Sequence, residues 1–245
     1  MFNKKLKINA FLKKSLTVNQ PEKGYRYAID AVLLASRPRP KPGDTLIDLG
    51  TGCGIIALIV AHRYPGTRIH AVDIQPELVR FARQNVLSNG MSDRITVHEM
   101  DMRQLTPSMV DGPTDWIISN PPYHRANSGR INPNGQKALA RHEINIDLCQ
   151  LTKVSRRLLR TGGRFCTIYP AERIADLIYS LHDAGIEPKW LQIVHSRSGT
   201  EGKFVLLEAI KGSRPGLRVA APLTIYAADG AYTAEVQKMM LPDPN

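Results

Sequence analysis

The sequence has 245 residues, 42% of them hydrophobic, which is enough to bury a core and excludes a largely disordered chain. Lys and Arg number 33 against 22 Asp and Glu, so the formal net charge is +11 and a polyanion is a candidate partner. The longest apolar run, residues 55–61, is far shorter than the ~20 residues of a membrane-spanning helix, so no membrane partner is expected.

The positive charge is concentrated at the N-terminus. Residues 1–41 carry a net charge of +8, and the rest of the chain carries only +3. Three prolines within residues 37–43 (RPRPKPG) cannot continue a helix and mark a boundary. We predict a basic leader over residues 1–41, including a cofactor-covering segment, and one domain over residues 42–245. A nucleic-acid-binding arm and a solvated tail both fit the leader's charge.

The N-terminus and the cysteines favour a cytoplasmic protein. Lys13 and Lys14 interrupt any apolar stretch that a secretory signal would need. Cys53, Cys149 and Cys166 are odd in number and widely spaced, without a CxxC pair. We therefore expect neither a disulfide framework nor a metal site.

Strand-like and helix-like segments alternate along the domain. Short β-branched stretches predict strands at residues 45–49, 68–73, 94–99, 115–119, 164–169, 190–195 and 204–210. Longer segments predict helices at residues 54–63, 76–88, 144–160 and 171–184. This alternation predicts an α/β fold with a doubly wound, mostly parallel sheet of seven strands, whose last two form an antiparallel pair. Near the end of the third helix, Arg156, Arg157 and Arg160 are interpreted as a solvated face.

A glycine-rich turn follows the first predicted strand, in the segment Asp48-Leu49-Gly50-Thr51-Gly52-Cys53-Gly54. Gly50 and Gly52 let the backbone turn sharply and let a ligand approach without a Cβ in the way. No Gly-Lys-Ser/Thr follows, which excludes a P-loop. A tight strand-to-helix connection without a ligand is the alternative interpretation.

Two further acids follow the next two predicted strands. Asp73, which precedes Ile74, can accept both hydroxyls of a ribose or cap the helix that begins at Pro76. Asp101 can accept the adenine amino group while Met102 covers the ring, or it can belong to a surface turn. Acids after three successive strands indicate a nucleoside-binding edge, because ligands of such sheets bind beyond the carboxyl ends of the strands.

This edge resembles the nucleotide-binding loop of class I S-adenosylmethionine-dependent methyltransferases, which have a Rossmann-like fold. The resemblance implies S-adenosyl-L-methionine as the cofactor. It also implies a set of cofactor-binding residues, namely Asp48, Gly50, Gly52, Asp73, Ile74, Asp101, Met102 and Asn120.

The most specific motif is Asn120-Pro121-Pro122-Tyr123, after the predicted strand at residues 115–119. Two prolines remove two N–H donors and stiffen the backbone. The Asn120 side-chain oxygen and the Pro121 carbonyl can then accept both protons of a planar amine, and Tyr123 can stack on the base. A strand-terminating turn is the alternative. The motif resembles the signature of methyltransferases that act on adenine N6, guanine N2 or glutamine amides, which implies catalytic roles for Asn120, Pro121 and Tyr123.

Three other segments narrow the resemblance. Residues 16–20 (LTVNQ), 24–35 (GYRYAIDAVLLA) and 140–143 (ARHE) resemble the bacterial family that methylates N6 of the adenine 3′ of the anticodon in valine tRNA. The resemblance covers almost the whole chain. It implies that Arg26 and Asp30 lie over the cofactor, where an ordinary helix N-terminus is the alternative. It also implies that tRNA is the partner, and that the leader and residues 124–137 bind its phosphates.

Three rival functions stay open. The same chemistry suits the glutamine amide of a release factor, although that family usually carries a larger helical N-terminal domain. Guanine N2 of ribosomal RNA is an amine that the same pocket can hold. A chain that kept the fold and RNA binding but lost catalysis is the non-enzymatic reading, against which the intact motifs argue.

Overall fold

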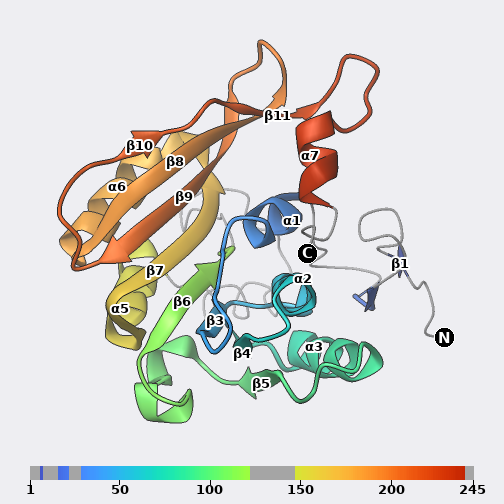
Figure 1. Cartoon of the computed structure of the whole chain (residues 1–245), viewed down its shortest axis with the longest axis vertical. Helices are drawn as coiled ribbons and strands as arrows, with labels where there is room; N and C mark the ends of the chain where they lie inside the picture. The colour runs from blue at the N-terminus through green and yellow to red at the C-terminus, as the bar shows by residue number, and fades with distance from the viewer. Residues whose placement is uncertain (1–5, 8–15, 22–28, 122–146, 241–245) are drawn as a thin grey trace, which may run out of the picture.

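The computed structural model describes residues 6–7, 16–21, 29–121 and 147–240, and one large sheet organises them (Figure 1). In this part of the chain the sheet holds nine strands in the order β10-β8-β9-β7-β6-β3-β4-β5, with β11 also pairing with β8. The strands are β3 (Thr45–Leu49), β4 (Arg68–Asp73), β5 (Ile95–Glu99), β6 (Thr114–Ser119), β7 (Leu159–Pro170), β8 (Ile186–Arg197), β9 (Gly202–Lys211), β10 (Arg218–Val219) and β11 (Leu223–Tyr226).

The sheet topology confirms the predicted fold class. Strands β3 to β7 are parallel, and β9 is antiparallel to both of its neighbours, β7 and β8. The strand number is larger than the seven predicted, because β10 and β11 add two short strands beside β8. A strand of two residues such as β10 shows no periodicity. In β11, however, buried Leu223 and Ile225 alternate with half-buried residues, a signal that the prediction did not use.

Helices cover both faces of the sheet (Figure 1). Helices α1 (Ile29–Ala35), α2 (Ile55–Arg63), α3 (Pro76–Ser88) and α7 (Ala234–Met239) pack into one core layer. Helices α5 (Leu148–Leu158) and α6 (Ile174–Asp183) pack into the other. The short 3₁₀ turns are η2 (Met102–Gln104), η3 (Pro107–Met109) and η4 (Ala171–Arg173). Side chains of β3 alternate between the layers, since Leu46 belongs to the first and Ile47 and Leu49 to the second.

The longest apolar run of the sequence forms most of α2. Every side chain from residue 55 to 61 is buried, which explains why this helix shows no polar face. Among the described helices, none combines the length and the apolar character that crossing a membrane requires.

Part of the predicted leader packs against the domain. Strands β1 (Leu6–Lys7) and β2 (Thr17–Val18) pair antiparallel, and the side chains of Leu16 and Val18 are buried in the first core layer. Helix α1 lies in the same layer, against α2. The division of the chain at residue 41 stays a prediction.

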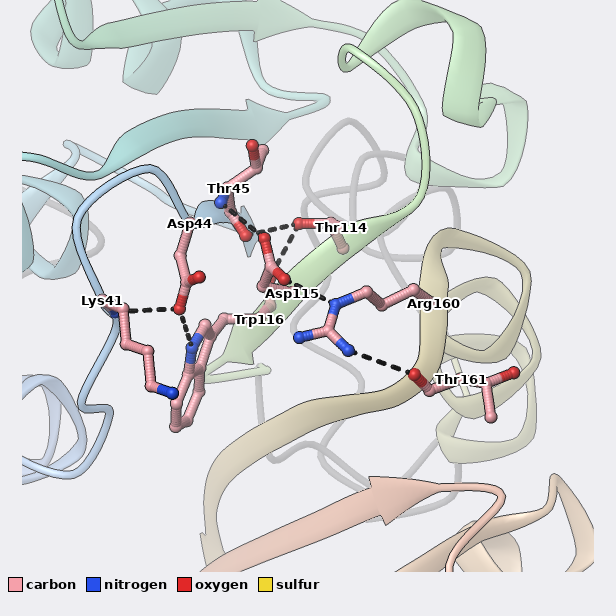
Figure 2. A network of polar contacts seen from close by, with 8 residues as sticks. All are labelled: Lys41, Asp44, Thr45, Thr114, Asp115, Trp116, Arg160 and Thr161. Carbon is pink, nitrogen blue, oxygen red and sulfur yellow. Dashed lines mark hydrogen bonds and ion pairs between the residues drawn. The ribbon is translucent and has the colours of Figure 1, made fainter.

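A polar network joins the amino ends of β3 and β6, at the edge opposite the strands' carboxyl ends (Figure 2). Asp115 accepts hydrogen bonds from the Thr45 backbone N–H at 2.9 Å and from Arg160 Nε at 2.6 Å. Trp116 Nε1 donates to Asp44 Oδ2 at 3.1 Å. The carboxylates therefore hold the amino ends of the two strands and their neighbouring segments together.

The three arginines interpreted as a solvated face do more than contact water. Besides the Arg160 contact with Asp115, the Arg156 side chain donates to the Ala184 carbonyl and the Arg157 side chain to the Leu105 carbonyl. Arg160, which was expected near the end of the helix, lies in β7 instead. A guanidinium group on a long stem reaches partners beyond its own helix or strand while staying exposed. The sequence pattern of α5 does not reveal such contacts.

Candidate active site

The glycine-rich turn connects β3 to α2 in a left-handed conformation. Gly50 and Gly52 have φ angles of +77° and +59°, which side chains with a Cβ rarely adopt. The backbone N–H groups of Gly50 and Thr51 both donate to the Val72 carbonyl, at 2.9 and 3.0 Å. This loop is therefore fixed to the end of β4, the neighbouring strand.

Asp48 lies beneath this loop and does not line the cavity that the loop borders. Its side chain is fully buried and accepts a hydrogen bond from Thr51 Oγ at 2.7 Å. Burial raises the pKa of Asp48 to about 7, although the Thr51 hydrogen bond opposes the shift. This geometry favours support of the loop, and direct binding of a cofactor by Asp48 stays a prediction.

Asp73, the last residue of β4, binds the backbone of the glycine-rich turn. Its Oδ2 accepts from the Gly52 backbone N–H at 2.8 Å and its Oδ1 from the Gln75 N–H at 2.9 Å. Burial raises its pKa, and these backbone hydrogen bonds oppose that shift. Asp73 and half-exposed Ile74 both line the cavity, at the position expected for a ribose-binding acid.

The cavity opens at the carboxyl ends of β3, β4 and β6. Its polar rim includes Asp73, Ser119 and Asn120, and Gly50, Gly52 and Pro121 also line it. The remaining wall is mainly apolar, formed by Leu49, Val72, Leu78, Met100, Met102 and Leu151. A flat apolar ring with a polar sugar fits such a combination of walls.

Asp101, the third predicted acid, pairs with Arg103. The Asp101 carboxylate accepts hydrogen bonds from the backbone N–H and from Nε of Arg103, each at 2.8 Å. These bonds, rather than burial, dominate its environment and lower its pKa. Met102 lines the cavity and Asp101 does not, so binding of the adenine amine by Asp101 stays a prediction that competes with its pairing to Arg103.

Asn120 lies directly after β6, on the rim of the same cavity. The Ser119 hydroxyl donates to the Leu49 carbonyl at 2.8 Å, and the Thr167 hydroxyl donates to the Ser119 carbonyl at 2.8 Å. The end of β6 is thus held by both neighbouring strands. The Asn120 amide is buried and donates through Nδ2 to Asp30 Oδ2 at 3.3 Å.

The structure thus brings Gly50, Gly52, Asp73, Asn120 and Pro121 to one cavity, together with Ile74 and Met102. Asp30 contacts the site through Asn120. Arg26, Tyr123 and the proposed phosphate-binding residues 124–137 lie outside the described residues.

Asn85 supports the glycine loop, a role that sequence reasoning missed. From α3 it donates to the Cys53 carbonyl in the glycine loop at 2.9 Å and to the Asn19 carbonyl at 2.8 Å, and it accepts from the Asn19 N–H at 2.7 Å. Its side chain is fully buried. A lone Asn within an otherwise apolar helix face was the available signal, because a buried amide must find partners.

Metal-ligating side chains do not gather in the described part of the chain: no three His, Cys, Asp or Glu residues there are arranged to hold an ion. Cys53, Cys149 and Cys166 are free thiols. The polar groups of the cavity are therefore carboxylate, amide, hydroxyl and backbone groups.

Comparison with known proteins places the chain among methyltransferases. Residues 28–171 match the methyltransferase small domain family. A tRNA1(Val) (adenine(37)-N6)-methyltransferase of Phocaeicola vulgatus is 32% identical over 194 residues, which cover 79% of this chain and 80% of that protein. A protein of the same name from Aeromonas hydrophila is 28% identical, over 92% of each chain.

A solved structure also resembles the fold closely. The crystal structure of a predicted O-methyltransferase from Agrobacterium tumefaciens superposes with a TM-score of 0.69 and 25% sequence identity, over 86% of this chain and 95% of that one. The chain therefore belongs to the methyltransferase small domain family and to the family of the tRNA1(Val) (adenine(37)-N6)-methyltransferases.

Proposed function

We propose that this protein transfers a methyl group from S-adenosylmethionine to N6 of an adenine in tRNA, at the position 3′ of the anticodon in valine tRNA. One observation carries the proposal. Asn120 and Pro121, the first half of the amino-methyltransferase motif, border the same cavity as Gly50, Gly52 and Asp73. Amine recognition and nucleoside binding thus meet at one edge of the sheet.

The cavity suits the cofactor in three respects. The backbone of Gly50 and Gly52 turns with positive φ angles, and the absence of a Cβ allows the close approach of a ligand. Asp73 has a second lone pair on each carboxylate oxygen, so that its two backbone hydrogen bonds leave capacity for ribose hydroxyls. The apolar wall that includes Leu78 and Met102 suits the adenine ring.

The chemistry follows from the groups at Asn120 and Pro121. The cofactor supplies an electrophilic methyl group on a sulfonium sulfur. The Asn120 amide oxygen and the Pro121 carbonyl accept the two protons of the exocyclic amine, which directs its lone pair out of conjugation. The nitrogen–methyl bond would form as the sulfur–methyl bond breaks, S-adenosylhomocysteine would leave, and the positively charged amine would then release one proton to solvent. No strong base is needed beforehand, because the amine becomes acidic only as the new bond forms.

The identity of the substrate is supported by charge and by the relatives. A net charge of +11, with +8 in residues 1–41, suits an RNA polyanion. The relatives from Phocaeicola vulgatus and Aeromonas hydrophila are named for the adenine at position 37 of tRNA1(Val). We propose the cytoplasm, where tRNA is found, as the place of action. The target base must leave its stack to reach the cavity.

The test uses tritiated S-adenosylmethionine with bulk tRNA, ribosomal RNA or a protein extract from a strain that lacks the gene. The RNA is digested to nucleosides, and binding of S-adenosylmethionine is measured in parallel. We expect label in N6-methyladenosine from tRNA. Label in N2-methylguanosine from ribosomal RNA would overturn the choice of substrate. Label in a protein extract alone would indicate a glutamine amide as the substrate. Absence of label in every substrate, together with no measurable binding of S-adenosylmethionine, would overturn the enzymatic function.

A further inference from the structure

Asp30 contacts the amide that the proposed reaction uses. It lies in the first turn of α1, where its Oδ1 accepts from the Ala31 N–H at 2.8 Å. Its Oδ2 accepts from Asn120 Nδ2 at 3.3 Å, across 90 positions of sequence. Both side chains are buried, and each residue is 9% exposed. A buried contact between a carboxylate and a site amide restricts how that amide can turn.

The chemistry of the two groups sets the orientation. A side-chain amide has a donating end and an accepting end of nearly the same shape, and a carboxylate only accepts. With Nδ2 directed at Asp30, the amide oxygen of Asn120 must point away from that carboxylate. We propose that Asp30 is a positioning residue, which holds Asn120 with its oxygen presented to the substrate amine. This inference rests on the proposed function, because it assigns a role within the same reaction.

The elements that carry Asp30 and Asn120 are both fixed by further contacts. Just after α1, Arg37 Nε donates to Glu208 Oε2 on β9 at 2.8 Å, and α1 packs against α2. On the other side, Ser119 is fixed to β3 and β7 by hydroxyl hydrogen bonds. A side chain is positioned well only where its supporting elements are rigid, and here both elements are anchored to the sheet.

The proposal differs from direct cofactor binding by Asp30, which the family resemblance implied. A cofactor ligand contributes to affinity, whereas a group that orients Asn120 contributes to the transition state. The variant Asp30→Asn keeps the shape of the side chain but offers either an amide oxygen or an N–H, so it can pair with either end of the Asn120 amide. We expect kcat to fall by about 10- to 100-fold, the loss typical of one hydrogen bond to a charged group.

The first experiment is a double-mutant cycle with Asp30→Asn and Asn120→Ala, in which kcat and the Kd for S-adenosylhomocysteine are both measured. We expect the Asp30 substitution to change Kd by less than about threefold and to cost less than about twofold in kcat once Asn120 is absent. Asp183→Asn, an exposed acid at the end of α6, is the matched control. Additive losses in kcat, or a loss confined to cofactor affinity, would overturn the proposal.

The second experiment does not depend on the substrate. The side-chain ¹H–¹⁵N signals of Asn120 are assigned from the spectrum of Asn120→Ser, and the exchange of these protons with solvent is followed. We expect exchange at least about tenfold faster in Asp30→Ala than in the unmodified protein or in Asp183→Asn. Unchanged exchange would overturn the contact itself. If the protein methylates no RNA, the proposed function fails while this measurement still decides whether Asp30 holds Asn120.

Discussion

Asn85 donates a hydrogen bond to the carbonyl of Cys53, 2.9 Å away, and so ties α3 to the glycine loop. The same amide binds the backbone of Asn19 through both of its ends. Directly after the end of α3, Asn89 binds the backbone of Thr17 in the same way, at 2.9 and 2.7 Å, without reaching the loop. The segment at residues 16–21 is therefore coupled to the glycine loop through one residue.

The first prediction concerns this coupling. Asn85→Ala leaves the Cys53 carbonyl and the backbone of Asn19 without their amide partner, and we expect the Kd for S-adenosylhomocysteine to rise about fivefold, since one hydrogen bond contributes about 1 kcal/mol. Isothermal titration calorimetry measures the change. Asn89→Ala removes the contact to Thr17 and a hydrogen bond to the Asn85 carbonyl but none to the glycine loop, and it should change Kd by less than about twofold. Equal effects of the two variants would show that the loop contact is unimportant.

The second prediction concerns the amine. Asn120→Ala removes one of the two acceptors proposed for the reacting amine, and we expect kcat to fall by ~10²–10³, as when one polar partner of a developing charge is lost. The Kd for S-adenosylhomocysteine should change much less than kcat. Single-turnover methylation at saturating tRNA and cofactor measures the effect, with Asn89→Ala as the matched control. A kcat within about threefold of the original would remove Asn120 from the reaction.

Much of this site could be predicted from the sequence, because the position where a strand ends depends on the residues close to it in the chain. The bounds of β3 and β4 match the predicted residues, and parallel strands bring their carboxyl ends to one edge. Gly50, Asp73 and Asn120 therefore meet as expected. The choice of side-chain partner did not follow from the sequence.

Three examples show why the hydrogen-bond partners of these side chains could not be predicted from the sequence. Asp101 pairs with Arg103, only two residues away, because a long and flexible guanidinium side chain lies within hydrogen-bonding distance of the carboxylate. Asp30 and Asn120 meet across 90 residues, and Asn85 and Cys53 across 32. Such contacts depend on how α1 and α3 pack over the sheet, which hydrophobic periodicity constrains only to a face and not to a particular atom.

The third prediction is a pH dependence of stability. Burial raises the pKa of Asp48 from its ordinary value of 3.8 to about 7, so the folded protein keeps a proton that the unfolded chain releases. The stability from this proton is complete below pH 3.8 and is lost as the pH rises towards 7. Across this window the free energy of unfolding should fall by up to ~1.4 kcal/mol per pH unit on account of Asp48 alone.

Asp48→Asn removes this titration while still offering an oxygen to the Thr51 hydroxyl. We expect the difference in unfolding free energy, variant minus original, to increase from pH 4 to pH 7 and to stay level above pH 8. Urea denaturation at several pH values measures it, and groups that titrate in both proteins cancel in the difference. A difference that is constant with pH would mean that Asp48 is ionised throughout.

The fourth prediction concerns Glu208, which is 4% exposed on β9. Its carboxylate pairs with Arg37 at 2.6 Å and with Arg164, and the Arg37 guanidinium lies 3.8 Å from the centre of the Trp190 ring. Glu208→Gln leaves two cations facing each other without the anion between them. Removal of one partner from a fully buried pair costs ~3–5 kcal/mol, and because both arginines are partly exposed we expect a loss of about 2 kcal/mol in unfolding free energy.

Asp176→Asn is the matched comparison for Glu208→Gln, because Asp176 pairs with Arg173 on the surface and is 61% exposed at its side chain. Solvent screens that pair, so its loss should cost less than about 1 kcal/mol. Urea denaturation of both variants at pH 7 and two salt concentrations separates the cases. Similar losses for the two variants would mean that water already screens Glu208. A larger loss at Glu208 that persists in high salt would establish the buried carboxylate as the group that joins α1, β7 and β9.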